Sequence, residues 1–230
     1  MRRSQSPAPA PAPTPPTTPT TPAPLPPALT AKSKRLSWLL RHGAREAGVG
    51  IDSDGWVSLQ DALRVIGVTA QELEALIRAD RKGRFELRAG PPAQVRACQG
   101  HSGGVGVSAA ALEESWRPLE AEGGRAWHGT SVEGALAIAS SGLISPRART
   151  HVHLAAEVDS VVGKRAGVAV LLGVDIAALR EGGGELFMSP NGVLLAREVP
   201  TACVVEVRAL TRAGQARLDE LRAAFGLPRA

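Results

Sequence analysis

The first 30 residues limit what this chain can fold into more than any other feature. They hold 11 of the 18 prolines in the 230-residue sequence, mixed with alanine and threonine, and contain no acidic residue. A segment of this composition cannot bury a core, so we expect residues 1–30 to form a disordered, extended tail. About 200 residues remain, enough for one large domain or two small ones.

The net charge of +5 is unevenly distributed. Lysine and arginine minus aspartate and glutamate give +2 for residues 1–30, +4 for 31–106 and −1 for 107–230. A polyanion is expected to bind where the positive excess lies, which favours a nucleic acid as partner. A basic surface is also simply a soluble surface, so charge alone leaves both interpretations open.

Residues 31–106 show helices followed by a β-hairpin. Leu36, Leu39 and Leu40 recur at helical spacing, and Gly48 is suited to end that helix. We expect helices over 31–47, 59–66 and from the capping box at Thr69 to Ala79, and strands starting at Val57 and over 84–88 and 95–97. This order in a basic stretch predicts a winged-helix RNA-binding lobe. A small α+β domain without a nucleic-acid function would show the same pattern.

The glycines of residues 103–106 mark a linker to a second lobe, residues 107–230, built from short strands and helices. Residues 168–174 are apolar enough to form a strand buried on both faces. We expect the other strands at 125–128, 151–154, 193–195 and 203–209, and helices at 132–141, 157–165 and 215–224. The fold class predicted is therefore α+β with two lobes.

Several function classes are excluded by what the sequence lacks. No apolar stretch is long enough to span a bilayer, and no apolar run follows Arg2 and Arg3 as a secretion signal requires. Cys98 and Cys203 are too few for a disulfide framework and lack metal-ligand spacing. We therefore expect a cytoplasmic protein without a membrane partner. Tyrosine is absent, which excludes mechanisms that need a phenol.

All five histidines lie in short polar motifs, three of which also hold an arginine. The motifs are L-S-W-L-L-R-H with Arg41 and His42, R-A-C-Q-G-H-S with Arg96 and His101, W-H-G-T with His128, and R-T-H-V-H-L with His151 and His153. Arginine beside histidine at distant points of a chain predicts a folded site that binds a phosphate-bearing substrate. Taken alone, Arg41 would be solvated and His42 packed at a helix end.

Neighbouring residues in these motifs add polar groups. Gly100 lets the backbone come close to a ligand and Ser102 adds a donor. His128 and Thr130 can hydrogen-bond a sugar, with Gly129 allowing close approach; a tight turn with Thr130 as helix cap fits equally well.

His151 and His153 alternate on a predicted strand, so both imidazoles are expected on one side. Further metal ligands at a suitable spacing are lacking, so we expect no metal there and a hydrogen-bonding role instead.

Eight segments occur in an order similar to that of the RNA 2′-phosphotransferases, the KptA or tRNA 2′-phosphotransferase family. They are L-S-W-L-L-R-H, G-W-V-S-L, R-K-G-R-F, R-A-C-Q-G-H-S, W-H-G-T, R-T-H-V-H-L, V-G-K-R-A-G and S-P-N-G-V-L-L. The resemblance runs from about Lys32 to Val205. Departures are small: Ala44 stands where the family usually has proline, and Trp127 replaces a frequent tyrosine.

The resemblance implies an ADP-ribosyltransferase-like second lobe and an NAD-dependent transfer without a metal. In that reaction an internal RNA 2′-phosphate attacks the nicotinamide ribose, nicotinamide leaves, and 2′-phospho-ADP-ribosylated RNA forms. The ribose 2″-hydroxyl then attacks phosphorus, which gives 2′-hydroxyl RNA and ADP-ribose 1″,2″-cyclic phosphate. The implied partners are NAD and RNA carrying a 2′-phosphate, from tRNA splicing or RNA repair, and we expect a monomer.

Site residues follow by match to the family motifs. The expected catalytic set is Arg41, His42, Arg96 and Arg165, and the RNA and phosphate set is Arg41, His42, Arg96, His101 and Ser102. The expected NAD set is His128, Gly129, Thr130, His153, Ser189, Asn191 and Gly192. Guanidinium groups suit phosphate oxygens and the charge that develops in the second step, and His42 can supply a proton or hydrogen bond.

Three alternatives remain open at this point. The first is a metal-free ribonuclease with His42 and His101 as acid and base, which would cleave RNA without NAD. The second is a non-catalytic nucleic-acid binder with a degenerate second lobe. The third stops after the first step and leaves ADP-ribose on terminal phosphates of RNA or DNA.

Overall fold

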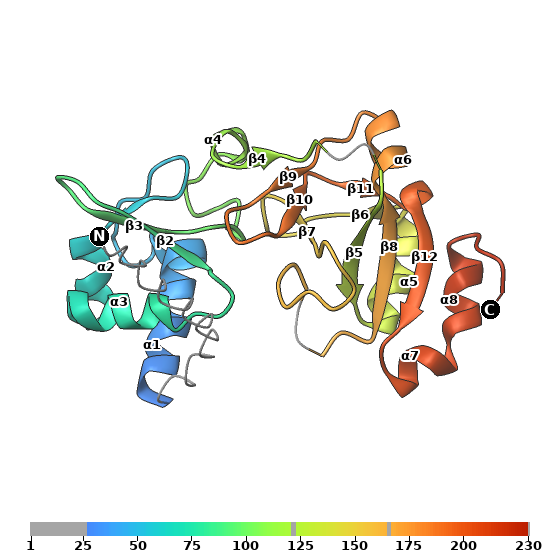
Figure 1. Ribbon diagram of the computed structural model, residues 1–230, viewed down its shortest axis with the longest axis horizontal. Helices are drawn as coiled ribbons and strands as arrows, with labels where there is room; N and C mark the ends of the chain where they lie inside the picture. Colours follow the sequence, from blue (N-terminus) through green and yellow to red (C-terminus); the bar gives the residue numbers. More distant parts are fainter. Residues whose placement is uncertain (1–26, 121–122, 165–166, 230) are drawn as a thin grey trace, which may run out of the picture.

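Two groups of helices and strands lie at opposite ends of the molecule in the computed structural model, which describes residues 27–120, 123–164 and 167–229 (Figure 1). The structure mixes α and β elements, and its strands pair antiparallel in small sheets. The predicted combination of helices and short strands is therefore confirmed. Within the described residues, no helix has both the length and the apolar character needed to cross a membrane.

The N-terminal lobe contains three α-helices, a π-helical turn and a three-stranded sheet. Its elements are α1 (Pro27–Trp38), the π-helix η1 (Leu39–Gly43), β1 (Val57–Ser58), α2 (Leu59–Ile66), α3 (Ala70–Arg78), β2 (Phe85–Arg88) and β3 (Gln94–Ala97). The sheet has the order β1-β3-β2, and the β2-β3 hairpin pairs Phe85 with Ala97. Helices followed by a hairpin are confirmed.

Apolar side chains from every helix and strand of this lobe form its core. The buried set is Leu36, Leu39, Leu40, Val49, Val57, Ala62, Ile66, Leu73, Leu76, Phe85, Val95 and Ala97. The predicted capping box is present, because Thr69 Oγ1 accepts from the Glu72 amide and the Glu72 carboxylate accepts from the Thr69 amide. Ser58 precedes α2 as expected but makes no side-chain cap bond.

The first helix differs from its prediction at both ends. It begins at Pro27, so the described residues 27–30, assigned to the tail, are helical. It ends as an α-helix at Trp38 and continues as the π-turn η1 instead of remaining regular to residue 47. The indole ring of Trp38 lies over Gly43, where any Cβ would overlap it. The missing side chain at Gly43 lets the chain widen into a π-turn at Arg41 and His42.

The C-terminal part begins with two elements that join the lobes, α4 (Ala109–Glu114) and β4 (Arg117–Pro118) (Figure 1). The elements that follow are β5 (Arg125–Thr130), α5 (Val132–Ser141), β6 (Leu143–Ile144), β7 (Val152–Leu154), β8 (Val170–Asp175), α6 (Ile176–Glu181), β9 (Phe187–Met188), β10 (Leu194–Ala196), β11 (Val199–Pro200), η2 (Thr201–Cys203), β12 (Val204–Ala209), α7 (Arg212–Ala216) and α8 (Leu218–Ala224).

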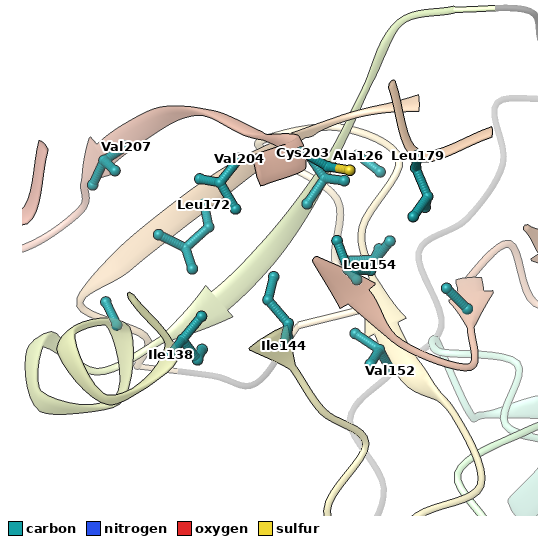
Figure 2. Close-up of a cluster of buried hydrophobic side chains, with 14 of the residues drawn as sticks. Ala126, Ile138, Ile144, Val152, Leu154, Leu172, Leu179, Cys203, Val204 and Val207 are labelled. Atoms are coloured by element: carbon teal, nitrogen blue, oxygen red, sulfur yellow. The ribbon is translucent and has the colours of Figure 1, made fainter. Parts of the chain in front are cut away.

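Small sheets pack around one main core in this lobe, and two smaller apolar clusters lie beside it. Their orders are β12-β8-β5, β4-β9-β10-β7 and β11-β6. Val170–Val174 are all buried, as expected for the central strand β8. Figure 2 shows side chains from several strands and helices converging, among them Ile138, Ile144, Leu154, Leu172 and Val204. An isolated bridge between Trp127 and Ala155 brings β5 beside the segment after β7, so the W-H-G-T and H-V-H motifs adjoin.

Two helix predictions in this lobe were wrong. Residues 157–164 form turns, because Gly163 has a positive φ of 77° and packs against the Leu154 carbonyl, where a Cβ would overlap. The C-terminal helix is divided into α7 and α8 at Arg217, whose φ of −118° is not helical. α4, α6 and the two-residue strands β4, β6, β9 and β11 were not predicted from the sequence.

Candidate phosphate-binding and dinucleotide site

Arg41 and His42 lie on the π-turn η1, which the buried side chains of Leu39 and Leu40 anchor in the core. The Arg41 guanidinium is half-buried and donates from Nη1 to Ser37 Oγ at 3.1 Å, while His42 is exposed. The π-turn therefore carries two different groups at adjacent positions: an arginine held by Ser37 and a solvent-accessible imidazole.

The R-A-C-Q-G-H-S segment docks directly on Arg41. Ser102 donates from its amide and its hydroxyl to the Arg41 carbonyl, at 2.9 and 3.2 Å. Gly100 has a φ of 90°, and a Cβ there would lie 3.3 Å from Arg41 Nε. Two motifs about 60 residues apart are thus in contact, with the glycine permitting the approach.

Arg41 is half-buried near two further cations, Arg84 and Arg149, and Asp80 pairs with Arg84 at 2.9 Å. Burial, followed by the charges of Arg84 and Arg149, lowers the pKa of its guanidinium to about 10. Arg41 Nε is buried, and no group in the described part of the chain accepts its hydrogen bond. A buried unpaired guanidinium N–H beside further cations favours a bound anion.

Arg96 is buried and firmly held. Its Nε donates to Glu86 Oε2 at 2.7 Å, its Nη1 donates to the Asp54 carbonyl at 3.2 Å, and its guanidinium stacks 4.6 Å from the Trp56 ring centroid. These contacts use Nε, Nη1 and one face of the guanidinium. Arg96 is therefore oriented by protein groups instead of being free in solvent.

His101 is fully buried, and the charges of both arginines act on it. Burial, then the charges of Arg41 and Arg96, lowers the pKa of its imidazole to about 3. Neither ring nitrogen has a hydrogen-bond partner among the described residues, and a Cβ on Gly55 would lie 2.7 Å from Nε2. A neutral, enclosed imidazole cannot exchange protons with a substrate, so the role of His101 in the site is structural.

The two histidines of H-V-H bind different partners. His151 is fully buried, with Nε2 2.8 Å from Glu113 Oε1, and it packs edge-on against Trp116. His153 on β7 donates from Nε2 to Gln99 Oε1 at 2.8 Å. Among the described residues no group of three or more histidine, cysteine, aspartate or glutamate side chains is arranged to hold a metal.

His153 joins the R-A-C-Q-G-H-S segment to the W-H-G-T motif. Burial, then the charge of Arg149, holds the pKa of His153 well below its usual range, and Arg149 Nη1 lies 3.3 Å from His153 Nδ1. His128 Nδ1 lies 3.2 Å from the His153 carbonyl, within hydrogen-bond distance. Gly129 follows, and a Cβ there would lie 3.0 Å from Val168. His128, Gly129 and Thr130 are each half-buried, which leaves part of their surface accessible to a ligand.

The S-P-N-G loop lines a pocket of about 330 Å³ at the edge of β9. Its lining consists of Ser115, Arg117, Met188, Ser189, Pro190 and Gly192. The Ser189 hydroxyl is buried and donates within the loop, to Asn191 Oδ1 at 2.9 Å or the Val193 carbonyl at 3.1 Å. Asn191 Nδ2 donates to the Lys82 carbonyl of the other lobe at 2.8 Å. Ser189 and Asn191 therefore shape the loop, and Gly192 borders the pocket.

The structure brings most of the predicted residues into one region between the lobes. Arg41, His42, Arg96, His101 and Ser102 adjoin through the contacts above, and His153 reaches the same region through Gln99. Arg165 lies outside the residues that the structure describes.

Sequence reasoning did not single out Arg84, Gln99 or Arg149 as site residues. Arg84 and Arg149 add charge beside Arg41, and Gln99 links His153 to the segment that docks on Arg41. All three stand inside motifs that the sequence analysis named, so their membership in those motifs was the available signal.

Comparison with known proteins agrees with this arrangement. The model of the "RNA 2'-phosphotransferase, Tpt1 / KptA family" matches residues 28–198. A "Probable RNA 2'-phosphotransferase" of Rhizobium rhizogenes is 33% identical over 179 residues, covering 75% of this chain and 90% of that protein. One of Pseudomonas syringae pv. tomato is 33% identical over 184 residues, covering 76% and 92%.

A relative from a third organism carries the same kind of name. "Probable RNA 2'-phosphotransferase 2" of Archaeoglobus fulgidus is 36% identical over 165 residues, covering 67% of this chain and 69% of that protein. The match spans both lobes and contains the docked motifs around Arg41, so the resemblance in the sequence is confirmed and the chain belongs to the Tpt1 / KptA family of RNA 2′-phosphotransferases.

Proposed function

We propose that this protein removes an internal 2′-phosphate from RNA in an NAD-dependent reaction. The products are 2′-hydroxyl RNA, ADP-ribose 1″,2″-cyclic phosphate and nicotinamide. Family membership supports the RNA 2′-phosphotransferase class. The environment of Arg41 is the observation that carries the proposal for this particular site.

Arg41 has the properties of a phosphate ligand. Its Nε–H is buried without a partner among the described residues, and the pKa of its guanidinium is lowered to about 10 by burial, Arg84 and Arg149. A dianionic 2′-phosphate would satisfy the free N–H and offset the repulsion among these cations. Glu86 and Asp54 orient Arg96 nearby, so its remaining Nη2 edge is the part available to a phosphate.

His42 is the exposed titratable group beside this phosphate site. Burial, then Arg41 and Arg149, lowers the pKa of its imidazole, so it is neutral at physiological pH. A neutral imidazole can accept a proton from an attacking ribose hydroxyl or hydrogen-bond a phosphate oxygen. We assign the first of these roles to His42 in the second step, and we retain Arg165 in the catalytic set by its motif.

The C-terminal lobe offers a surface that suits a dinucleotide. Gly129 leaves room for the Val168 side chain to pack on β5, His128 lies within hydrogen-bond distance of the His153 carbonyl, and the S-P-N-G loop borders a pocket of about 330 Å³. When bound, NAD supplies an electrophilic ribose carbon and a neutral leaving group. We propose that His128, Gly129, Thr130, His153 and Gly192 contact it, and that Ser189 and Asn191 hold the loop in place.

The lobe assignments belong to the same proposal. The order helix, strand, helix, helix, hairpin with a β1-β3-β2 sheet supports a winged-helix module for residues up to 106. Antiparallel sheets with His128 on β5 and His153 on β7 support an ADP-ribosyltransferase-like lobe after it. RNA and NAD would meet where the lobes adjoin, at the contacts that link Arg41 to Ser102 and Gln99 to His153.

The ribonuclease alternative requires His101 as an acid or base. Its imidazole is fully buried with a pKa of about 3, so it is neutral and inaccessible at the pH of catalysis. His101 therefore cannot serve as the acid or base that a ribonuclease would need. The non-catalytic binder and the terminal-phosphate transferase remain as outcomes of the experiment.

The test is incubation with a short RNA bearing one internal 2′-phosphate, with and without NAD. We expect loss of the phosphate and release of nicotinamide only with NAD, and loss of transfer by at least a hundredfold in Arg41→Ala. Arg212→Ala, an exposed arginine on α7, is the matched control and should transfer normally. Unchanged RNA under both conditions would overturn the proposal, and ADP-ribose retained on the RNA would indicate that the reaction stops after one step.

A further inference from the structure

The first helix and the π-turn and turn that follow it present a row of basic residues with a tryptophan in its middle. Lys34, Arg35, Trp38, His42 and Arg45 are all exposed, and we call them the helix-1 face. Residues three or four apart lie on one side of a helix, so Lys34 and Arg35 adjoin Trp38 on one side and His42 adjoins it on the other. The row from Lys34 to His42 is about 12 Å long at 1.5 Å per residue.

Few carboxylates offset the positive charge of the helix-1 face. Glu46 is the one carboxylate between residues 31 and 50. Lys34, Arg35 and Arg45 form no ion pair with any described residue, whereas Lys32, three residues before Arg35, pairs with Glu72. A basic row without carboxylates attracts phosphates.

Trp38 stands apart from the other tryptophans. It is 37% exposed, while Trp56, Trp116 and Trp127 are buried. Its indole ring lies over the backbone of Gly43, which has no side chain to displace it. The ring thus rests across the π-turn immediately beside the exposed His42, with part of its surface open to solvent.

We propose that the helix-1 face binds the single-stranded RNA that flanks the 2′-phosphorylated nucleotide, with one base stacked on Trp38. This inference rests on the proposed function, because it starts from a 2′-phosphate bound at Arg41 and His42. Lys34 and Arg35 then contact backbone phosphates farther along the strand. Aromatic stacking combined with basic side chains is how proteins bind single-stranded nucleic acid without reading its sequence.

A competing explanation is purely structural: Trp38 covers Gly43 and keeps the π-turn from opening. Three substitutions separate the two roles. Trp38→Phe keeps an aromatic face, Trp38→Leu keeps apolar cover without one, and Trp38→Ala removes both. Thermal unfolding of each variant shows how far the cover matters for folding.

The experiment measures binding, in the absence of NAD, of a single-stranded octanucleotide with a central 2′-phosphate and of a 2′-phosphorylated mononucleotide. We expect Trp38→Ala and Trp38→Leu to bind the octanucleotide about tenfold more weakly and Trp38→Phe to bind it within about threefold of the original protein. All should bind the mononucleotide alike. Leu210→Ala, which removes an exposed apolar side chain at the far end of β12, is the control.

The cations are tested by salt dependence. Lys34→Ala with Arg35→Ala should lower the slope of log affinity against log salt by about 1.4, or about 0.7 for each lost phosphate contact. Arg212→Ala should leave the slope unchanged. Equal octanucleotide binding by Trp38→Leu and Trp38→Phe, or an unchanged slope, would overturn the inference. If either contradicting result is found and the original protein still transfers the phosphate normally, the inference fails but the proposed function stands. If the original protein transfers no phosphate, the proposed function itself is overturned.

Discussion

Asn191 of the C-terminal lobe donates from Nδ2 to the main-chain carbonyl of Lys82 in the N-terminal lobe, at 2.8 Å. Its Oδ1 accepts from the Ser189 hydroxyl at 2.9 Å. Its Cβ also lies beside Gly83, where an added Cβ would be 3.4 Å away, at van der Waals distance. Asn191, expected from its motif to contact NAD, therefore uses both ends of its amide inside the protein. It connects the S-P-N-G loop to the turn between α3 and β2.

Asn191→Asp is predicted to loosen this connection. The carboxylate still accepts from Ser189 but cannot donate to the Lys82 carbonyl and is repelled by it. Loss of one such hydrogen bond, about 0.5–1.5 kcal/mol, should lower kcat/KM for 2′-phosphorylated RNA by about two- to tenfold. Steady-state kinetics with each substrate varied in turn measures the effect.

Asn191→Ala should match Asn191→Asp if the Lys82 bond is what matters. A defect only in the alanine variant would instead assign the effect to the bond with Ser189. Val161→Ala, on an exposed side chain of the same lobe, is the control and should leave both kinetic constants unchanged.

Glu86→Gln is predicted to misorient Arg96. Glu86 Oε2 accepts a 2.7 Å charge-assisted bond from Arg96 Nε, and the neutral amide would hold the guanidinium less firmly. We expect kcat to fall about tenfold with little change in KM for NAD. Single-turnover transfer measures the chemical step directly.

The control for Glu86 is Glu220→Gln, which removes a comparable pair with Arg217 on α8, far from the site. Its turnover should equal that of the original protein. Activity of Glu86→Gln at the level of this control would show that Asp54 and Trp56 suffice to orient Arg96.

His101 makes stability depend on pH in the acid range. In the unfolded chain its imidazole takes up a proton near pH 6.5, whereas in the folded protein its pKa is about 3 because of burial and the charges of Arg41 and Arg96. The unfolded state therefore binds more protons below pH 6.5, and stability is lost progressively as pH falls toward 3. This group alone should lower the free energy of unfolding by about 2 kcal/mol between pH 7.5 and 5.

Urea unfolding at several pH values, compared with His101→Asn, measures this contribution. The variant should be less stable at pH 7.5 but lose about 2 kcal/mol less on acidification. Titration of the His101 ring protons by NMR in the original protein is a second measurement, and a midpoint above pH 5 would contradict the prediction.

Elements with a strong local signal could be predicted from the sequence. The capping box at Thr69, the hairpin strands and the apolar strand β8 appear within a few residues of their predicted bounds. Features that depend on how individual side chains pack could not be predicted. Gly163 leaves the helical region because it packs against Leu154, and the π-turn depends on Trp38 lying over Gly43, so neither was visible in a local pattern.

The site shows the same division. Motifs predicted which segments meet, and the contact of Ser102 with Arg41 agrees with that expectation. The motifs did not distinguish residues that contact a ligand from residues that hold those contacting residues in position. His101 and Ser189 are polar members of motifs, yet both are buried, because a site that fixes charged side chains needs a layer of polar groups behind it.

Gly100→Ala tests whether close approach to Arg41 is essential. The new Cβ would lie 3.3 Å from Arg41 Nε and 3.5 Å from its Cδ, so the guanidinium must shift by a few tenths of an ångström. Gly100 also has a φ of 90°, so alanine adds backbone strain of about 1–2 kcal/mol. Gly48→Ala is the matched control, because Gly48 has a φ of 63° and a Cβ there would meet nothing within 4 Å.

Both glycine variants should lose similar stability, but only Gly100→Ala should lose phosphotransfer, by about tenfold or more, because a displaced guanidinium no longer fits the phosphate. Thermal unfolding and single-turnover transfer, measured on the same preparations, separate the two effects. Equal transfer by the two variants would mean that Arg41 tolerates the shift and that the glycine serves only the turn. Restoration of transfer at high concentrations of 2′-phosphorylated RNA would instead show that Arg41 acts mainly in binding, since a defect in the chemical step persists at saturation.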